Sequence, residues 1–325
     1  MVSKLNYLVT GGTGSFGKSF IKFILKKKNT NKVVIFSRDE IKQEKMQKEF
    51  KYHPKLRFFL GDVRDKERLF RALDGIDYVV HAAALKIVPL GEINPFECVK
   101  TNINGAMNII DACIDRKVKK VIALSTDKAC LPVNLYGATK LASDKLFISG
   151  NIYSGKQKTI FSIVRYGNVF GSRGSIVPYL LSSKKKTKIN LTDEKMTRFF
   201  LSLNQAVQMV FDAFKDMRGG EIYVKKAPSI RIIDLITYLA PGKKLNKIAI
   251  RPGEKIHETM ISPQDALFTY EAARYYKIIS PLFSIKRFNL RNLKKVSSSF
   301  FYSSSNNKDW INKLKLKKLI KDLNQ

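Results

Sequence analysis

A glycine-rich turn between a strand and a helix is the feature of this 325-residue chain that most restricts its fold. Residues 7–10 have the pattern of a buried strand, residues 11–17 read GGTGSFG, and a helical pattern follows. Glycines in such a turn let the backbone approach a pyrophosphate, and the free N–H groups of the helix start bind its charge. The segment predicts a Rossmann-type, doubly wound parallel α/β sheet, with a dinucleotide bound by Gly11, Gly14, Ser15, Phe16 and Gly17.

Further apolar runs extend this first unit into a sheet. They lie at residues 32–37, 56–60, 77–81 and 119–124. Strands that alternate with helical stretches are typical of βαβ units. Because open α/β sheets bind ligands at the carboxyl ends of their strands, the residues that follow each run are candidates for the cofactor and substrate sites.

The end of the second strand bears on the choice between NAD and NADP. An acidic residue there binds the ribose 2′-hydroxyl of NAD, whereas a basic residue accommodates the 2′-phosphate of NADP. Ser37 and Arg38 stand at the strand end, and Lys42 follows. Asp39 comes slightly late for an NAD contact but could still turn inward. We therefore predict NADP, with Arg38 and Lys42 among its contacts.

The third and fourth strands supply further cofactor candidates. Asp62 and Val63 follow the run at 56–60. Asp62 fits either a hydrogen bond to the adenine amino group or a turn before the next helix. Ala82 follows the run at 77–81, and its small side chain lets the backbone lie close to the cofactor.

Two neighbouring segments place a hydroxyl, a carboxylate, an ammonium and a phenol in one window. Residues 125–128 read STDK and follow the strand predicted at 119–124. Tyr136 and Lys140 lie four apart, so a helix over residues 136–148 would put both on one face. A nearby ammonium lowers the pKa of a phenol from about 10 and makes it a better base. Tyr-x-x-x-Lys also occurs on helix surfaces, but beside a dinucleotide turn it indicates an acid/base site.

These segments carry a family resemblance. The chain resembles extended short-chain dehydrogenase/reductases, and within them the inverting UDP-N-acetylglucosamine 4,6-dehydratases. The Asp127-Lys128 pair is the most discriminating match, because simple epimerases of this fold lack such a pair and retaining dehydratases typically have Asp-Glu. The matching segments run from about residue 7 to 310 and are TGGTGSFG, SRDE, GDVRD, HAAALK, KTNINGAMNII, STDKA, YGATK, VRYGNVFGSRGS, TDEKMTRFF, RPGEKIHE and FYSSSNNKDW.

The resemblance implies a mechanism that begins with oxidation, because the C5 proton of a hexose becomes acidic only when C4 is a ketone. Tyr136 would take the 4-hydroxyl proton, with Lys140 holding the cofactor ribose and lowering the tyrosine pKa. Thr126 or Ser125 would share the 4-oxygen. Lys128, as a neutral amine, would remove the C5 proton, and protonated Asp127 would donate to the departing C6 hydroxyl. Burial shifts both groups towards these forms, while their mutual attraction opposes it.

The resemblance also implies binding residues outside this window. Lys86 is expected to contact cofactor and substrate, and Val169 to lie beside the cofactor. Asn168 is expected to meet the substrate diphosphate. Arg198 and Arg251 are expected near the UDP group, because a planar guanidinium pairs with phosphate oxygens. Each arginine could instead form a surface or interlobe salt bridge.

The strand and helix pattern loosens after about residue 170, which predicts two lobes. We expect an NADP-binding domain over residues 1–170, with return segments near 200–225. Residues 171–288 would form mainly a substrate-binding lobe. By resemblance, residues 289–325 would pack near the substrate pocket.

The net charge of +33 is the feature that an enzyme of this kind explains least. A basic chain attracts nucleic acid, so an RNA-binding protein on this fold is the non-enzyme alternative. The lysine clusters at 26–28, 184–186 and 317–318 are scattered, however, and no aromatic stacking motif accompanies them. A solvated lysine-rich surface is the simpler interpretation, and we expect no nucleic-acid partner.

Several further expectations concern partners and compartment. Cysteines at 98, 113 and 130 have no metal or disulfide spacing, which fits a reducing cytoplasm, and no apolar run is long enough to span a membrane. The resemblance implies a homo-oligomer, dimer or hexamer. The alternative enzymes are a 4,6-dehydratase that epimerises C5 for capsule sugars and a nucleotide-sugar 4-epimerase.

Overall fold

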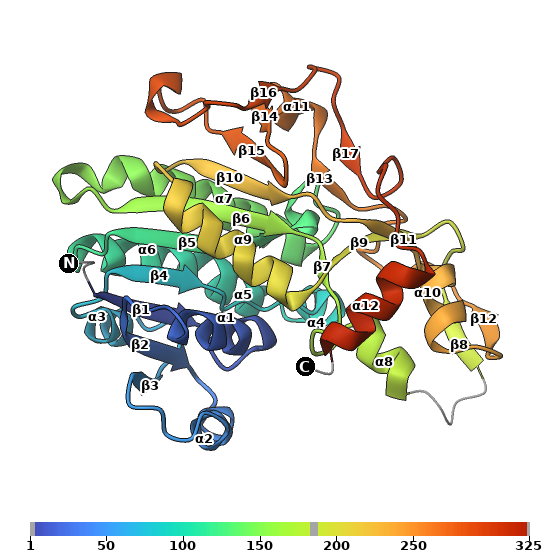
Figure 1. Ribbon diagram of the computed structural model, residues 1–325, viewed down its shortest axis with the longest axis horizontal. Helices are drawn as coiled ribbons and strands as arrows, with labels where there is room; N and C mark the ends of the chain where they lie inside the picture. Colours follow the sequence, from blue (N-terminus) through green and yellow to red (C-terminus); the bar gives the residue numbers. More distant parts are fainter. Residues whose placement is uncertain (1–3, 183–187, 324–325) are drawn as a thin grey trace.

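A ten-stranded sheet forms the centre of the computed structural model, which describes residues 4–182 and 188–323 (Figure 1). The lysine cluster at 184–186 therefore lies outside the described residues. Seven neighbouring strands run parallel in the order β3-β2-β1-β4-β5-β6-β10, and β15, β14 and β16 continue the sheet antiparallel. The predicted Rossmann-type, doubly wound parallel fold is confirmed. The strands are β1 (Leu5–Thr10), β2 (Thr30–Ser37), β3 (Leu56–Leu60), β4 (Tyr78–His81), β5 (Lys120–Thr126), β6 (Ile160–Tyr166), β10 (Glu221–Lys225), β14 (Thr269–Glu271), β15 (Tyr275–Ile279) and β16 (Lys294–Lys295).

Helices cover both faces of the parallel strands, as buried parallel sheets require. Helices α1 and α9 pack together on one face, while α3, α6 and α7 pack in sequence on the other (Figure 1). None of the described helices is both long and apolar enough to cross a membrane. The helices that accompany the parallel strands are α1 (Ser15–Leu25), α2 (Glu40–Glu49), α3 (Lys66–Ala72), α4 (Val88–Ile93), α5 (Pro95–Val99), α6 (Gly105–Asp115), α7 (Leu135–Tyr153) and α9 (Leu203–Asp216).

A second, smaller hydrophobic cluster lies beside the sheet. It joins Phe170 and Phe200 to apolar residues of α8, α10 and α12, including Leu316 of α12. We retain the two-lobe division near residue 170 as a proposal that this separate cluster supports. The remaining elements are β7 (Asn168–Val169), α8 (Ile176–Ser182), β8 (Lys188–Leu191), β9 (Thr197–Leu201), β11 (Ser229–Arg231), α10 (Ile232–Leu239), β12 (Lys244–Lys247), β13 (Thr259–Ile261), α11 (Pro263–Ala266), β17 (Tyr302–Ser303) and α12 (Lys313–Leu323).

The glycine turn lies where the strand order reverses between β1 and β4. Gly11 has φ +63°, and a Cβ there would lie 3.0 Å from the carbonyl oxygen of Ala82. Only glycine fits this approach without strain. Helix α1 begins at Ser15 and no side chain caps it, so its first N–H groups remain available to a ligand.

Gly17 sets how closely α1 packs against this turn. A Cβ on Gly17 would lie 2.5 Å from both the Cα and the carbonyl oxygen of Gly12. We expect Gly17→Ala to lower the free energy of unfolding by about 1–3 kcal/mol, because backbone must move to admit the methyl group. Denaturant unfolding without cofactor measures it. Gly91→Ala is the control, since its nearest neighbour would be Cys98 Sγ at 3.7 Å; equal stability losses in both variants would contradict the packing argument.

Candidate active site

Strand β5 and helix α7 bring the predicted acid/base residues together. Thr126 ends β5, and a 3₁₀ turn over Asp127–Ala129 follows. Asn134 caps α7 by accepting a hydrogen bond from the Gly137 N–H at 2.7 Å. A Cβ on Gly137 would lie 2.2 Å from the carbonyl oxygen of Lys128. This glycine therefore allows the first turn of α7, which carries Tyr136, to lie directly against the turn that carries Lys128.

The Asp127 carboxyl is fully buried. Its Oδ1 accepts hydrogen bonds from Lys128 Nζ at 3.1 Å and from the Thr126 hydroxyl at 3.0 Å. Its Oδ2 is buried without a hydrogen-bond partner. Burial raises the pKa of Asp127, and the nearby Glu258 charge adds to this although Lys128 opposes it. The direction predicted for a proton-donating Asp127 is confirmed.

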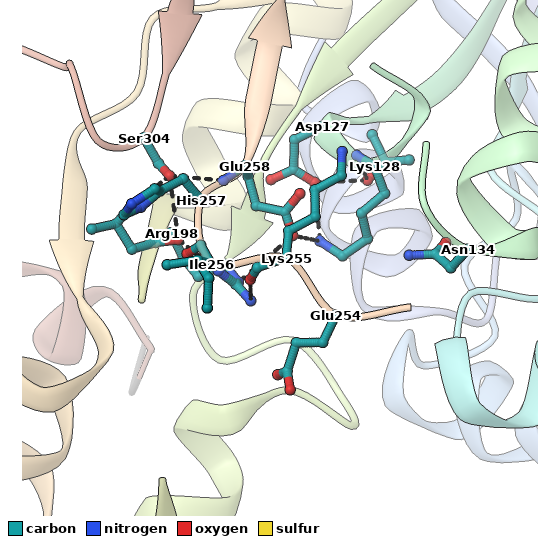
Figure 2. Close-up of polar contacts among 12 residues, drawn as sticks. Asp127, Lys128, Asn134, Arg198, Glu254, Lys255, Ile256, His257, Glu258 and Ser304 are labelled. Carbon is teal, nitrogen blue, oxygen red and sulfur yellow. Dashed lines mark hydrogen bonds and ion pairs between the residues drawn. The ribbon is translucent and has the colours of Figure 1, made fainter. Parts of the chain in front are cut away.

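Lys128 lies between two carboxylates, and the sequence analysis had considered only one. Lys128 Nζ is 3.1 Å from Asp127 Oδ1 and also 3.1 Å from Glu258 Oε1, which is buried (Figure 2). Burial of Lys128 disfavours the ammonium, but the charges of Asp127 and Glu258 outweigh it and raise the Lys128 pKa above its ordinary value. The downward pKa shift expected for Lys128 is therefore not found, because the second carboxylate stabilises the ammonium.

The environment of Tyr136 also differs from expectation. Burial raises the pKa of Tyr136 to about 12, with partial opposition from the Lys128 ammonium and the Thr126 hydroxyl. Lys128 rather than Lys140 is the cation that favours the phenolate. Burial lowers the pKa of Lys140, against the charge of Asp144 one turn further along α7. The prediction that Lys140 lowers the tyrosine pKa is not supported in the protein without cofactor.

Ser125 points away from the acid/base residues. Its hydroxyl donates to Asp144 Oδ2 at 2.7 Å, and Arg165 Nη2 lies 3.4 Å from the same oxygen. All three residues are buried. Alternating residues of a strand face opposite sides, so only Thr126 of this pair turns towards Asp127. Of the two hydroxyls considered for the 4-oxygen, Thr126 is the one in position.

The two arginines expected at the UDP group have different surroundings. Arg198 is buried, and three of its N–H groups donate to the carbonyl oxygens of Thr197, Lys255 and Ile256 at 2.7–3.0 Å. These hydrogen bonds engage three of the five guanidinium N–H groups; the phosphate contact expected for Arg198 stays a proposal. Arg251 has an exposed side chain paired with Glu254; it stays a proposed substrate contact.

The cofactor candidates meet at the carboxyl ends of β1, β2 and β3. Asp39 caps α2 and pairs with Lys42, so its carboxylate is engaged locally. Arg38 Nη1 lies 3.6 Å from Asp62 Oδ2. Asp62 Oδ1 accepts a hydrogen bond from the Arg64 N–H at 3.0 Å. This bond is typical of a turn before a helix, which is one of the two roles considered for Asp62.

A loop after β7 covers the glycine turn. Arg173 donates through Nη2 to the Thr13 carbonyl at 2.5 Å, and its backbone N–H approaches the Ser15 hydroxyl at 3.5 Å. Lys86 Nζ donates to the Arg173 carbonyl at 3.5 Å. This loop brings Lys86 to the cofactor side of the sheet, whereas the sequence analysis did not single out Arg173.

A cavity lies next to this site but is not lined by its acid/base residues. Its volume is about 510 Å³. It lies between the loop after β12 and the C-terminal segment around β17, and its lining includes Lys255, His257, Phe301 and Ser303. The segment 289–325 thus borders a cavity, and its expected place beside the substrate pocket stays a proposal.

Known proteins are similar to this chain over nearly its whole length. The family described as "Polysaccharide biosynthesis protein" matches residues 7–280. The chain belongs to this family. A UDP-N-acetylglucosamine 4,6-dehydratase (inverting) of Campylobacter jejuni is 51% identical over 330 residues, which cover 98% of each chain. A UDP-glucose 4-epimerase of Rickettsia akari is 39% identical and covers 96% of this chain and 94% of the relative. The X-ray structure of Pen from Bacillus thuringiensis has a TM-score of 0.92 at 39% identity, covering 100% and 99% of the two chains.

Glu258 of this polysaccharide biosynthesis protein was not predicted from the sequence to be a site residue. Glu258 belongs to the segment RPGEKIHE, which carried the resemblance but was used only for Arg251. Glu258 precedes an apolar strand and stands at no distinctive spacing from residues 127–128, so one sequence could not reveal its contact with Lys128. Its position in the segment RPGEKIHE, which carries the family resemblance, was the available indication that it belongs to the site.

Proposed function

We propose that this protein is an NADP-dependent UDP-N-acetylglucosamine 4,6-dehydratase that inverts C5 and yields UDP-2-acetamido-2,6-dideoxy-β-L-arabino-hex-4-ulose. One observation carries the proposal: the carboxyl and amino groups of Asp127 and Lys128 are 3.1 Å apart beside Tyr136 at the carboxyl end of β5. The C. jejuni relative named for this activity supports the same substrate.

Oxidation at C4 is the first task of the site. Tyr136 accepts the 4-hydroxyl proton, and Thr126 is placed to share a hydrogen bond with the same oxygen. The Lys128 ammonium favours the phenolate. Lys140 is kept as the proposed ribose contact. A general base of this kind contributes roughly 10²–10⁴-fold to a rate.

Elimination of water across C5 and C6 is the second task. Lys128 accepts the C5 proton, the C5–H electrons form the C5–C6 double bond, and the C6–O bond breaks as Asp127 gives its proton to the leaving hydroxyl. A buried, protonated carboxyl suits this donation. Lys128 has to lose one proton before it can act.

The residues around the glycine turn fit a nicotinamide dinucleotide. When bound, this cofactor accepts hydride from C4 and returns it to C6. The uncapped start of α1 and the close approach of Gly11 to Ala82 form a pyrophosphate cradle that a Cβ would fill. We propose that Asp62 contacts the adenine. The parts of the cofactor that NAD and NADP share would be held by Gly11, Gly14, Ser15, Phe16, Gly17, Val63, Ala82, Lys86, Lys140 and Val169.

The contacts of Asp39 support NADP over NAD. Its carboxylate caps α2 and pairs with Lys42, so it is not free to bind the ribose 2′-hydroxyl of NAD. Arg38 has an exposed side chain at the end of β2 and is placed for a 2′-phosphate. We expect Arg38→Ala to weaken NADP binding about 10–100-fold, as loss of a charge-assisted hydrogen bond implies, and to change NAD binding little. Calorimetric titration of both cofactors measures the difference.

Arg71→Ala is the matched control for this prediction, because Arg71 is an exposed arginine at the end of α3. Equal weakening of NADP and NAD in Arg38→Ala would place Arg38 at a part that both cofactors share. Unchanged NADP affinity would remove Arg38 from the site.

The finer features of the function remain proposals. We place the product in nonulosonic (pseudaminic) acid or surface glycan synthesis. The buried free thiols of Cys98, Cys113 and Cys130 support a reducing cytoplasm. We also propose a homo-oligomer, dimer or hexamer, and Asn168 and Arg251 as substrate contacts.

A UDP-glucose 4-epimerase is the second candidate, because the relative from R. akari has that name. A 4-epimerase only moves hydride to and from C4, so it has no use for a donor and an acceptor that remove water from C5 and C6. The Asp127–Lys128 pair therefore favours the dehydratase.

Incubation with UDP-N-acetylglucosamine in deuterium oxide, followed by proton NMR, tests the proposed function. A dehydratase removes the C6 hydroxyl, introduces deuterium at C5 and gives the ring couplings of an L-arabino 4-keto sugar. A D-configured ring at C5 would refute inversion. UDP-N-acetylgalactosamine with its C6 hydroxyl retained would establish the epimerase instead.

A further inference from the structure

The protonation of Lys128 poses a problem that Asp127 alone does not solve. Lys128 rests as an ammonium, yet it has to be an amine to take the C5 proton. Asp127 is the proton donor to the leaving hydroxyl, so it has to arrive at that step already protonated. A group other than Asp127 therefore has to hold Lys128 Nζ in position and govern how readily the lysine loses its proton.

Glu258 is the group that meets this requirement. Its Oε1 lies 3.1 Å from Lys128 Nζ, and its Oε2 is buried without a hydrogen-bond partner. The other charged or titratable groups that face Lys128 are Asp127 of the same turn, Tyr136 of α7, Arg198 of β9 and Lys255 of the loop before β13. Burial raises the pKa of Glu258, but the charges of Lys128, Arg198 and Lys255 outweigh this and lower it, so Glu258 stays a carboxylate beside the lysine.

The surrounding chain holds Glu258 firmly in place (Figure 2). Its N–H donates to the Ser304 hydroxyl at 2.9 Å, and its carbonyl oxygen accepts from the Ser304 N–H at 2.8 Å. Arg198 Nε lies 3.6 Å from Glu258 Oε1. Strand β9 and the C-terminal segment thus fix a carboxylate against the catalytic lysine, which is the support that a precise proton transfer needs.

We infer that Glu258 is a positioning residue that orients Lys128 and whose charge controls how readily Lys128 gives up a proton before C5 is deprotonated. The inference rests on the proposed dehydratase function. An Nζ–H bond of Lys128 breaks and the proton passes to solvent, because part of the lysine side chain is exposed, while Glu258 keeps its negative charge. The amine then takes the C5 proton and becomes an ammonium again, while Asp127 loses its proton to the departing water.

Glu258→Gln tests this role because glutamine keeps the shape of the side chain but carries no charge. We expect elimination at its optimal pH to slow about 10²-fold because the ion pair that orients Lys128 is lost, while oxidation at C4 changes by no more than about threefold. Single-turnover absorbance of the reduced cofactor reports oxidation, and proton NMR in deuterium oxide reports loss of the C6 hydroxyl. The rise of the elimination rate with pH should move to lower pH in the variant, because without the Glu258 charge Lys128 loses its proton more readily.

Two further variants keep the test decisive. Glu258→Asp retains the charge at a shorter reach and should lie between wild type and glutamine, which is also informative if Glu258→Gln does not fold. Glu221→Gln removes another fully buried carboxylate, bonded to the Ser162 hydroxyl at 2.7 Å, and should leave both steps unchanged in folded protein.

Contrary results separate the two levels of the argument. Wild-type protein that leaves UDP-N-acetylglucosamine unchanged would refute the proposed function and with it the premise. Active wild type together with undiminished elimination in Glu258→Gln would overturn the role of Glu258 alone. Equal loss of oxidation and elimination, with an unshifted pH dependence, would show that Glu258 only supports the structure.

Discussion

Replacing Lys128 with methionine is expected to leave oxidation at C4 intact and to reduce dehydration by about 10³-fold or more. Methionine has similar length but no group that can take the C5 proton. Removal of the ammonium leaves Asp127 and Glu258 close together, and both burial and the Glu258 charge raise the pKa of Asp127, which favours its neutral form. Single-turnover absorbance of the reduced cofactor and NMR detection of C5 deuterium measure the two steps separately.

Lys120→Met is the matched control for this variant. Lys120 lies at the opposite end of β5 and donates to the Phe214 carbonyl at 2.6 Å. It is expected to retain both steps. Deuterium entry at C5 at the wild-type rate in Lys128→Met would transfer the base role to another residue, and failure of oxidation would mean that the substitution disturbs Tyr136.

Replacing Tyr136 with phenylalanine is expected to reduce oxidation at C4 by about 10³-fold, and dehydration with it. No later step can proceed, since C5 is acidic only beside a C4 ketone. The same single-turnover measurement detects the loss. Tyr7→Phe is the control, because Tyr7 is a buried tyrosine of β1 whose pKa burial likewise raises to about 12.

The pH dependence of this step has a definite sign. Burial raises the pKa of Tyr136 to about 12, so below this value the phenolate fraction grows about tenfold with each pH unit. We expect kcat/KM of the wild type to rise with pH over the range in which the protein stays folded. A plateau near neutral pH would instead support the original expectation that a cation such as Lys140 lowers the tyrosine pKa. Retained oxidation in Tyr136→Phe would exclude Tyr136 as the base.

Local patterns were sufficient for the elements that bear the site. The run at 56–60 is β3 with the same bounds, and the helix expected over 136–148 is the central part of α7 (Leu135–Tyr153). Helices bury both faces of a parallel sheet, so its strands are apolar along nearly their whole length and alternate with helical stretches in the sequence. The antiparallel end of the sheet was not predicted, because β15, β14 and β16 join by pairings that no local pattern specifies.

Contacts between distant segments decided features of the site that one sequence does not show. Donors of Arg198 meet the backbone of residues 255 and 256 in a separate loop. Ser125 was considered beside Thr126, but strand alternation turns it towards Asp144. Residue type indicated that these side chains were important, whereas their partners depended on how the segments pack.

The sequence by itself determined the glycine cradle, the parallel sheet and the placing of Asp127, Lys128 and Tyr136 in one window, since each depends on residues close together in the chain. Tertiary structure alone decided the charge states. The resting ammonium of Lys128 depends on Glu258, which is remote in sequence and held by Ser304. Coulombic interaction and burial act through space, and their balance sets a pKa only after the fold has brought the groups together.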